Sequence, residues 1–132
     1  MGVDRGTNIV YNKDIKHLTP QTMRIWHEQL IPKLCQKHLC GMWREALGAY
    51  KIISDNRTDL AYFKHPATQE FVNAPIALWH ILSFVKLEME SRGYHPKDLP
   101  PKPIKMTSDR KPWQTLAEQT EHLKLKNCKC EI

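Results

Sequence analysis

The apolar residues of this chain recur every three or four positions over long stretches, which is the spacing of a helix with one buried face. The strongest such pattern covers residues 73–93, and a second covers 42–54. Asn73 and Gly93 fit the two capping positions of the first helix. Its apolar stripe consists of Leu78, Ile81, Leu82, Val85 and Met89. No segment alternates as a paired strand would, so the pattern predicts an all-α, small single-domain fold with long irregular connections.

The other segments give weaker patterns. Residues 32–38 are compatible with a short helix, and Gly41 is expected to break it. One helical turn is plausible after Pro66. The prolines within 97–112 predict an extended, irregular connection, and 113–125 could form a weak final helix.

Residues 1–22 show no sustained periodicity and are predicted to be an N-terminal extension outside a folded domain that covers 23–132. The extension is too polar for a secretory signal peptide. No apolar run approaches the roughly 18 residues that a membrane span needs. We therefore expect a cytoplasmic protein with no membrane partner, acting as a monomer.

The charge balance indicates an anionic partner. The chain has 20 lysine and arginine residues against 14 acidic ones, a net charge of +6. Residues 97–132 contribute about half of the excess. A basic domain of this kind is compatible with binding to a nucleic-acid backbone, although charge alone does not establish it.

The adjacent residues Arg44 and Glu45 are the clearest candidates for chemistry, six and seven positions after His38. Neighbouring side chains on a helix point about 100° apart, so these two cannot both lie at the centre of one buried face. Arginine binds phosphate through a bidentate fork, and glutamate can transfer protons or stabilise a cation. The alternative is that both are ordinary surface charges.

The four cysteines at positions 35, 40, 128 and 130 leave two interpretations open. With His38 they could in principle build a zinc site, but structural sites usually contain closer pairs such as C-x2-C, and the two halves here are about ninety residues apart. Cys35 and Cys40 could instead be small buried apolar residues, with Cys128 and Cys130 in a solvated tail. We expect reduced thiols, no metal and no cofactor.

Several motifs, taken in order and spacing, resemble the pyrimidine-dimer DNA glycosylase (bacteriophage endonuclease V-like) family. The resemblance is good over about 23–98 and weaker elsewhere. It rests on the segments Met23-Arg24-Ile25-Trp26, Lys37-His38-Leu39, Trp43-Arg44-Glu45-Ala46-Leu47, Phe63-Lys64-His65-Pro66 and Met89-Glu90-Ser91-Arg92-Gly93-Tyr94-His95. Arg110-Lys111-Pro112-Trp113 is loosely similar to an aromatic-bearing segment that approaches DNA.

The resemblance implies a small helical DNA-repair glycosylase with abasic-site lyase activity, acting on double-stranded DNA that contains pyrimidine dimers. An N-terminal amine, matched by Met23, would attack C1′ and form an imine, after which β-elimination cuts the strand. Glu45 would stabilise the cationic sugar and assist proton transfers, and Arg44 would hold phosphates near the lesion. The expected DNA-binding residues are His38, Arg24, Lys33, Lys37, Lys64 and Trp113.

The sequence departs from the family pattern at two places. Met23 follows 22 residues, so its nitrogen is an amide in this chain and cannot form an imine. Three explanations stay open: a different start site, processing that exposes an amine, or a protein that has lost this chemistry or uses a lysine. A further arginine of the phage enzyme would fall on Gly48, with Lys51 one turn later. The alternative function is a non-catalytic nucleic-acid-binding domain on the same fold, and a zinc-stabilised interaction module is a third.

Overall fold

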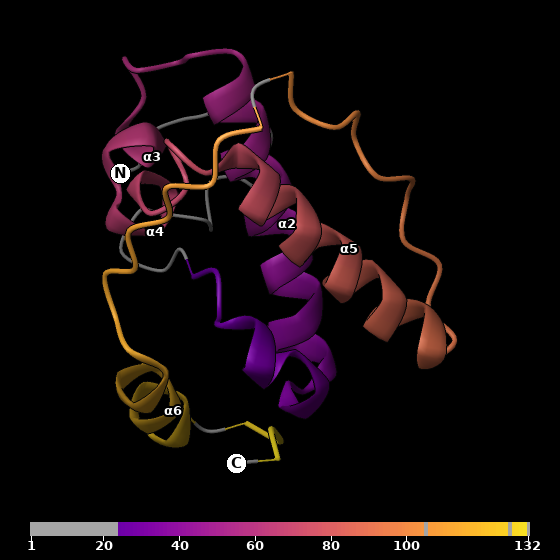
Figure 1. Cartoon of the computed structure of the whole chain (residues 1–132). Coiled ribbons are helices and arrows are strands. Elements are labelled where there is room, and N and C mark those ends of the chain that lie inside the picture. The colour runs from indigo at the N-terminus through magenta and orange to yellow at the C-terminus, as the bar shows by residue number, and fades with distance from the viewer. Residues whose placement is uncertain (1–23, 105, 127, 132) are drawn as a thin grey trace, which may run out of the picture.

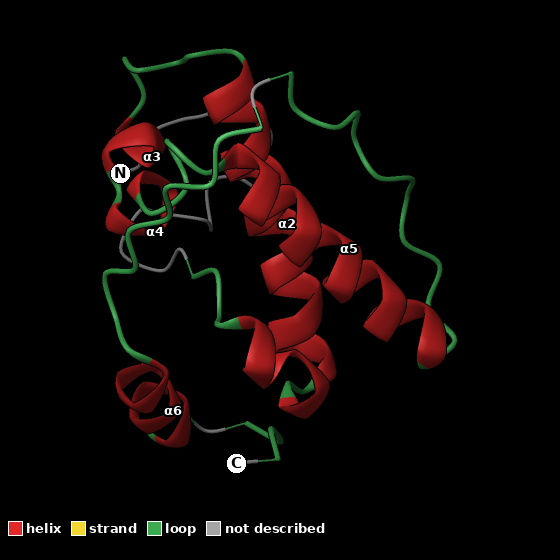
Figure 2. Cartoon of the chain, viewed as in Figure 1, coloured by secondary structure: helices red, strands yellow, loops and turns green. Residues whose placement is uncertain are grey.

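The computed structural model describes residues 24–104, 106–126 and 128–131, and within these ranges every regular element is a helix (Figure 2). This confirms the predicted all-α class; the extension over 1–22 and Met23 lie outside the described residues. None of the described helices is both long and apolar enough to cross a membrane. The elements are η2 (Glu28–Lys33, a 3-10 helix), α2 (Gln36–Ser54), α3 (Ala61–Lys64), α4 (Pro66–Gln69), α5 (Pro75–Ser91) and α6 (Leu116–Lys124).

The core lies between the two long helices α2 and α5, which pack side by side (Figure 1). The apolar stripe predicted on α5 is fully buried. Burying a leucine-sized side chain contributes about 1.5–3 kcal/mol, so this contact is the main source of stability. η2 packs on α5 as well and carries the buried Leu30 and Ile31. From α2 the buried side chains are Leu39, Met42, Trp43, Ala46, Ala49, Tyr50 and Ile52.

Helix α2 corrects the prediction of a short helix over 32–38 that breaks at Gly41. Pro32 lies instead near the end of η2, and the chain is extended at Leu34 and Cys35 before α2 begins. The helix then passes through Gly41 without a break. A glycine inside a helix costs about 1 kcal/mol relative to alanine, which the buried apolar residues on both sides offset.

Helix α5 begins one residue later than the capping prediction for Asn73 implies. Ala74 occupies the N-cap position, and Pro75 starts the helix with its backbone angle already fixed. The prediction for Gly93 is confirmed, since its φ is +87°. The Tyr94 amide donates to the Met89 carbonyl (2.9 Å), which satisfies a carbonyl that the helix end leaves open.

The connection from α5 to α6 is irregular, as the prolines predicted. It runs back along α5 and then crosses to α6 on the other side of the molecule (Figure 1). Two side chains of the core helices bind its backbone carbonyls. The Tyr50 hydroxyl donates to Pro101 O (2.7 Å), and the Trp79 indole donates to Pro100 O (2.8 Å). These bonds hold a segment that has no secondary structure of its own.

An ion-pair triad fixes the far end of this connection. Arg110 donates to Glu70 through Nε (2.6 Å) and to both oxygens of Glu28 through one terminal nitrogen (3.0 and 3.1 Å). Glu70 is only 4% exposed, so loss of Arg110 would leave a buried carboxylate without its ion-pair partner. The guanidinium also stacks on the Phe71 ring at 4.9 Å. Arg110 therefore joins η2, the end of α4 and the segment before α6.

Helix α6 is the predicted weak final helix, and it begins at Leu116 behind a capping box formed by Thr115 and Glu118. It attaches to the first described residues mainly by polar contacts. The buried Gln119 side chain accepts a hydrogen bond from the His27 amide (2.6 Å), and Leu123 supplies a fully buried apolar contact. The start of the domain is thus covered by its last helix.

Candidate functional site

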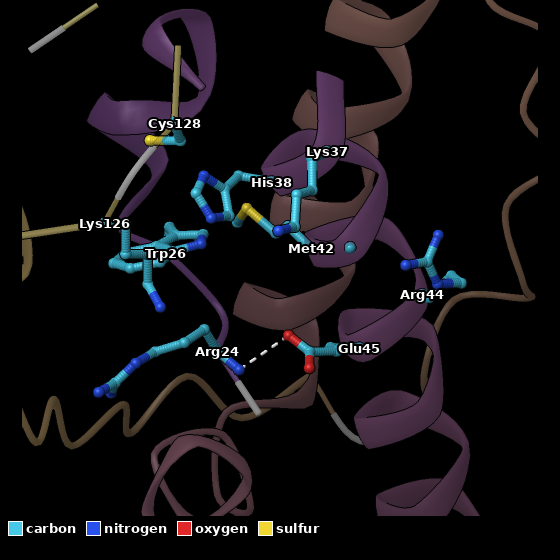
Figure 3. Close-up of a pocket in the computed structure, with 10 residues that line it drawn as sticks. Arg24, Trp26, Lys37, His38, Met42, Arg44, Glu45, Lys126 and Cys128 are labelled. Carbon is cyan, nitrogen blue, oxygen red and sulfur yellow. Dashed lines mark hydrogen bonds between the residues drawn. The ribbon is translucent and has the colours of Figure 1, made fainter. Parts of the chain in front are cut away.

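A pocket of about 440 Å³ lies where the first described residues, the first half of α2 and the C-terminal segment meet (Figure 3). Each part arrives by a different route. α2 presents one face to the pocket, the segment before η2 crosses that face, and the chain after α6 returns to it. The lining residues are Arg24, Trp26, Lys37, His38, Gly41, Met42, Arg44, Glu45, Lys126 and Cys128.

Glu45 is the acidic group of the pocket. It lies two helical turns after His38, which puts both residues on the same face of α2. Its Oε1 atom accepts a hydrogen bond from the backbone amide of Arg24 at 2.8 Å, drawn as the dashed line in Figure 3. Burial raises the pKa of Glu45 to about 7, although that hydrogen bond and the charges of Arg44, Arg24 and Lys126 act in the opposite direction. The carboxyl can therefore both donate and accept a proton near neutral pH.

The Arg24 side chain extends away from Glu45 (Figure 3) and is held by α6. One terminal nitrogen donates to the side-chain oxygen Oε1 of Gln114 (3.1 Å), and the other lies 3.2 Å from His122 Nε2. The guanidinium also lies 5.1 Å from the centre of the Trp113 ring and 5.9 Å from that of Trp26. The side-chain and backbone contacts of Arg24 together fix the position of the chain beside Glu45.

The pocket is strongly basic around this single carboxyl. Besides Arg24, its lining includes Lys37, Arg44 and Lys126. Arg44 is exposed and Glu45 half-buried, as expected for neighbours on a helix. Burial lowers the pKa of His38, and the charges of Lys126 and Lys37 lower it further, so the imidazole is neutral at pH 7. Four fixed cations and one titratable acid favour an anionic ligand such as a phosphodiester.

The structure brings together five of the predicted site residues in the pocket and places Lys33, Lys64 and Trp113 outside its lining, whereas Met23 lies outside the described residues. Lys33 and Lys64 are exposed at the ends of η2 and α3, outside the pocket. Trp113 does not line the pocket but packs beside it, 37% exposed, against Arg24 and edge-on to His65. The residues that meet in the pocket are Arg24, Lys37, His38, Arg44 and Glu45.

Sequence reasoning missed the contribution of the C-terminal segment. Lys126 and Cys128 line the pocket, and Gln114 and His122 hold Arg24. The one available signal was the density of basic residues after position 97. That density indicates an anionic partner but does not identify which lysine approaches Glu45.

A second group of side chains borders the pocket. Cys35, His38, Cys128 and Cys130 each offer one ligand atom, and these four atoms all lie within 4.8 Å of one another. All four residues are partly buried, which corrects the interpretation of Cys128 and Cys130 as a solvated tail. Cys40 does not belong to the group. Among the described residues this is the arrangement that could hold a metal ion.

Comparison with known proteins identifies the family. No curated protein and no solved structure matches the chain. The family model for pyrimidine dimer DNA glycosylase matches residues 23–100, which include Arg24, His38, Arg44 and Glu45. The match starts at Met23, the residue immediately before the amide that binds Glu45. Because the match covers more than half of the sequence, the chain belongs to the pyrimidine dimer DNA glycosylase family.

Proposed function

We propose that the protein is a pyrimidine-dimer DNA glycosylase with abasic-site lyase activity, and that its nucleophile is the α-amine of Met23. The observation that carries this proposal is the hydrogen bond between Glu45 and the amide of Arg24. Three covalent bonds separate that amide nitrogen from the nitrogen of Met23, so an amine there would lie within a few ångströms of a buried carboxyl that titrates at about 7.

The reaction needs a neutral amine. A free α-amine has a reference pKa of about 7.7–8.0, against about 10.4 for lysine, so a useful fraction is unprotonated near pH 7. The amine nitrogen attacks C1′ of the damaged nucleotide, and the bond from C1′ to the base breaks with its electron pair leaving on the base. Opening of the sugar ring then gives an imine between the nitrogen and C1′.

Glu45 supplies the proton transfers in this scheme. As a carboxylate it stabilises the positive charge that develops on the sugar and takes a proton from C2′ of the imine. The C3′–O bond then breaks, the phosphate leaves, and the strand is cut. Water finally hydrolyses the imine and frees the amine. A carboxyl whose pKa lies near the working pH suits both the acid and the base roles.

The cations around Glu45 would bind the backbone of the substrate strand. Arg44 and Lys37 are exposed at the pocket, and Lys126 reaches it from the opposite side. His38 and Arg24 complete the near contacts. Lys33, Lys64 and Trp113 would extend the contact along the duplex outside the pocket. Reaching C1′ inside a duplex requires bending the DNA and displacing a nucleotide from the stack.

This chemistry requires a polypeptide that begins at Met23. In the full sequence the Met23 nitrogen is bonded to the preceding carbonyl, so it has no free electron pair for imine formation. The proposal therefore predicts different activities for the two forms of the chain. The full-length form would bind DNA through the same basic pocket and leave the strand intact.

The test is strand cleavage of a duplex with one abasic site, and of the same duplex with one thymine dimer, by a chain that starts at Met23. We expect cleavage of both, with a loss of about 100-fold or more on abasic DNA for Glu45→Gln, in the range usual for a general acid or base. Glu121→Gln is the matched control, because Glu121 is exposed on α6. Binding without cleavage by the short form would overturn the enzyme proposal in favour of the non-catalytic DNA-binding domain.

A further inference from the structure

The cluster beside the pocket is formed by two segments far apart in the sequence. Cys35 is the N-cap residue of α2, and His38 follows one turn later on the same face. Cys128 and Cys130 come from the C-terminal segment, which crosses the start of α2. The crossing is held by a backbone hydrogen bond from the Glu131 amide to the Lys33 carbonyl (2.8 Å). The two halves of the cluster are about ninety residues apart in the sequence, but the fold brings them into contact, so that separation is no argument against a metal site.

The distances in the cluster are close to those of a tetrahedral metal centre. His38 Nδ1 lies 3.2 Å from Cys130 Sγ and 3.4 Å from Cys35 Sγ. With zinc–sulfur bonds of about 2.3 Å and zinc–nitrogen bonds of about 2.0–2.1 Å, a tetrahedron has sulfur–nitrogen edges of about 3.6 Å and sulfur–sulfur edges of about 3.8 Å. No two ligand atoms of the cluster are more than 4.8 Å apart, which exceeds the edge of the zinc tetrahedron by only about 1 Å.

The local structure also favours a thiolate at Cys35 and orients Cys130. Cys35 lies at the N-terminus of a 19-residue helix, where the helix dipole stabilises negative charge. Its backbone amide donates a hydrogen bond to Cys130 Sγ at 3.1 Å. A hydrogen bond from the backbone to a ligand sulfur is the kind of outer contact that orients metal ligands.

We propose that Cys35, His38, Cys128 and Cys130 bind a zinc ion in a closed site that fastens the C-terminal segment to the start of α2. Three thiolates and one imidazole are a standard ligand set for structural zinc, and four protein ligands leave no position for water or substrate. The ion stabilises the fold and takes no part in the reaction.

The site also shapes the neighbouring pocket. His38 and Cys128 belong to both the cluster and the pocket lining. Lys126 lies two residues before Cys128 and lines the pocket near Glu45. Holding Cys128 on α2 therefore keeps Lys126 against the pocket. Since Nδ1 of His38 faces the sulfur atoms, Nε2 stays available as a donor to a phosphate.

The experiment measures metal in the reduced full-length chain, without DNA. We expect one zinc per chain by elemental mass spectrometry. Replacement by Co²⁺ should give the thiolate-to-cobalt charge-transfer bands and the intense visible bands of a tetrahedral site. Cys130→Ser should weaken zinc binding more than the roughly 10–100-fold that loss of an outer-shell partner costs. Cys40→Ser is the matched control, since Cys40 is also a half-buried cysteine of α2 but lies outside the cluster.

A second readout does not depend on how a variant folds. In the wild-type chain zinc should protect Cys35, Cys128 and Cys130 from a thiol reagent and leave Cys40 reactive. After a chelator removes the zinc, all four cysteines should react. Substoichiometric zinc with no charge-transfer band, a disulfide between any two of these cysteines that persists under reducing conditions, or equal losses of zinc affinity in Cys130→Ser and Cys40→Ser would overturn the proposal. Because none of these measurements uses DNA, their results test the zinc site independently of the proposed strand cleavage.

Discussion

The Glu45→Gln variant should be more stable than the wild type above neutral pH and no more stable in acid. The substitution keeps an oxygen that can accept the hydrogen bond from the Arg24 amide, and it removes only the ability to ionise. The buried carboxyl is thereby replaced by a group that resembles its protonated form. The variant isolates the cost of placing a charge at this position.

The magnitude follows from the pKa of Glu45, which is about 7 in the folded chain against an ordinary value of 4.5. Each pKa unit corresponds to about 1.36 kcal/mol, so a difference of about 2.5 corresponds to about 3 kcal/mol. The pKa is raised, and the folded chain therefore binds the proton more tightly than the unfolded chain. The contribution of Glu45 to stability is thus largest below pH 4.5 and falls as the pH rises to about 7. The free energy of unfolding of Glu45→Gln should therefore exceed that of the wild type by about 3 kcal/mol at pH 8 and by about zero at pH 4.

Urea unfolding of both proteins at pH 4, 6 and 8 measures this difference directly. Glu121→Gln is the control, because Glu121 is 73% exposed and its substitution reports the effect of losing a surface charge. The stability difference between Glu45→Gln and the wild type should grow with pH, and the difference between Glu121→Gln and the wild type should stay nearly constant. Equal stability of Glu45→Gln and wild type at pH 8 would mean that Glu45 is well solvated, and the argument for its proton-transfer role would lose its physical basis.

Four further outcomes follow from the structure. Arg110→Ala should cost about 3 kcal/mol in urea unfolding, since it leaves the buried partner charge unpaired, whereas Lys111→Ala should cost almost nothing. Gly93→Ala should cost about 1 kcal/mol, because φ is +87° and the surrounding space is open, so the backbone alone resists the change. Arg44→Ala should lower the slope of log affinity for duplex DNA against log salt by about 1 if Arg44 binds a phosphate. Strand cleavage by the chain that starts at Met23 should fall by up to about 100-fold for each pH unit below 7, because both Glu45 and the Met23 amine become protonated.

The parts of the fold that could be predicted from the sequence are those set by local periodicity. The apolar stripe of α5 and its glycine end are each encoded within one short segment, and both predictions are confirmed. The start of α2 was predicted wrongly, because Pro32 and Gly41 are helix breakers by local preference. The energy that overrides Gly41 comes from packing against α5, which the local sequence does not contain.

The same division holds for the candidate site. His38, Arg44 and Glu45 could be grouped from the sequence by their spacing and by the family resemblance, although the predicted break at Gly41 placed His38 outside the helix that carries the other two. The approach of Lys126 could not be predicted, because it depends on how the chain folds back after α6. The metal-ligand cluster could not be established from the sequence for the same reason, because Cys128 and Cys130 reach Cys35 and His38 only through the path of the chain after α6.

The assignment of the Met23 amine as nucleophile is tested most directly by borohydride trapping on an abasic-site duplex, followed by peptide mapping of the cross-linked protein. Borohydride reduces an imine to a stable amine, so the modified peptide identifies the nitrogen that attacked C1′. With a chain that starts at Met23, we expect a cross-link on the N-terminal peptide. With the full sequence, in which the Met23 nitrogen is an amide, we expect no cross-link. A cross-link on a lysine, or equal trapping by both forms, would contradict the assignment of the Met23 amine as nucleophile.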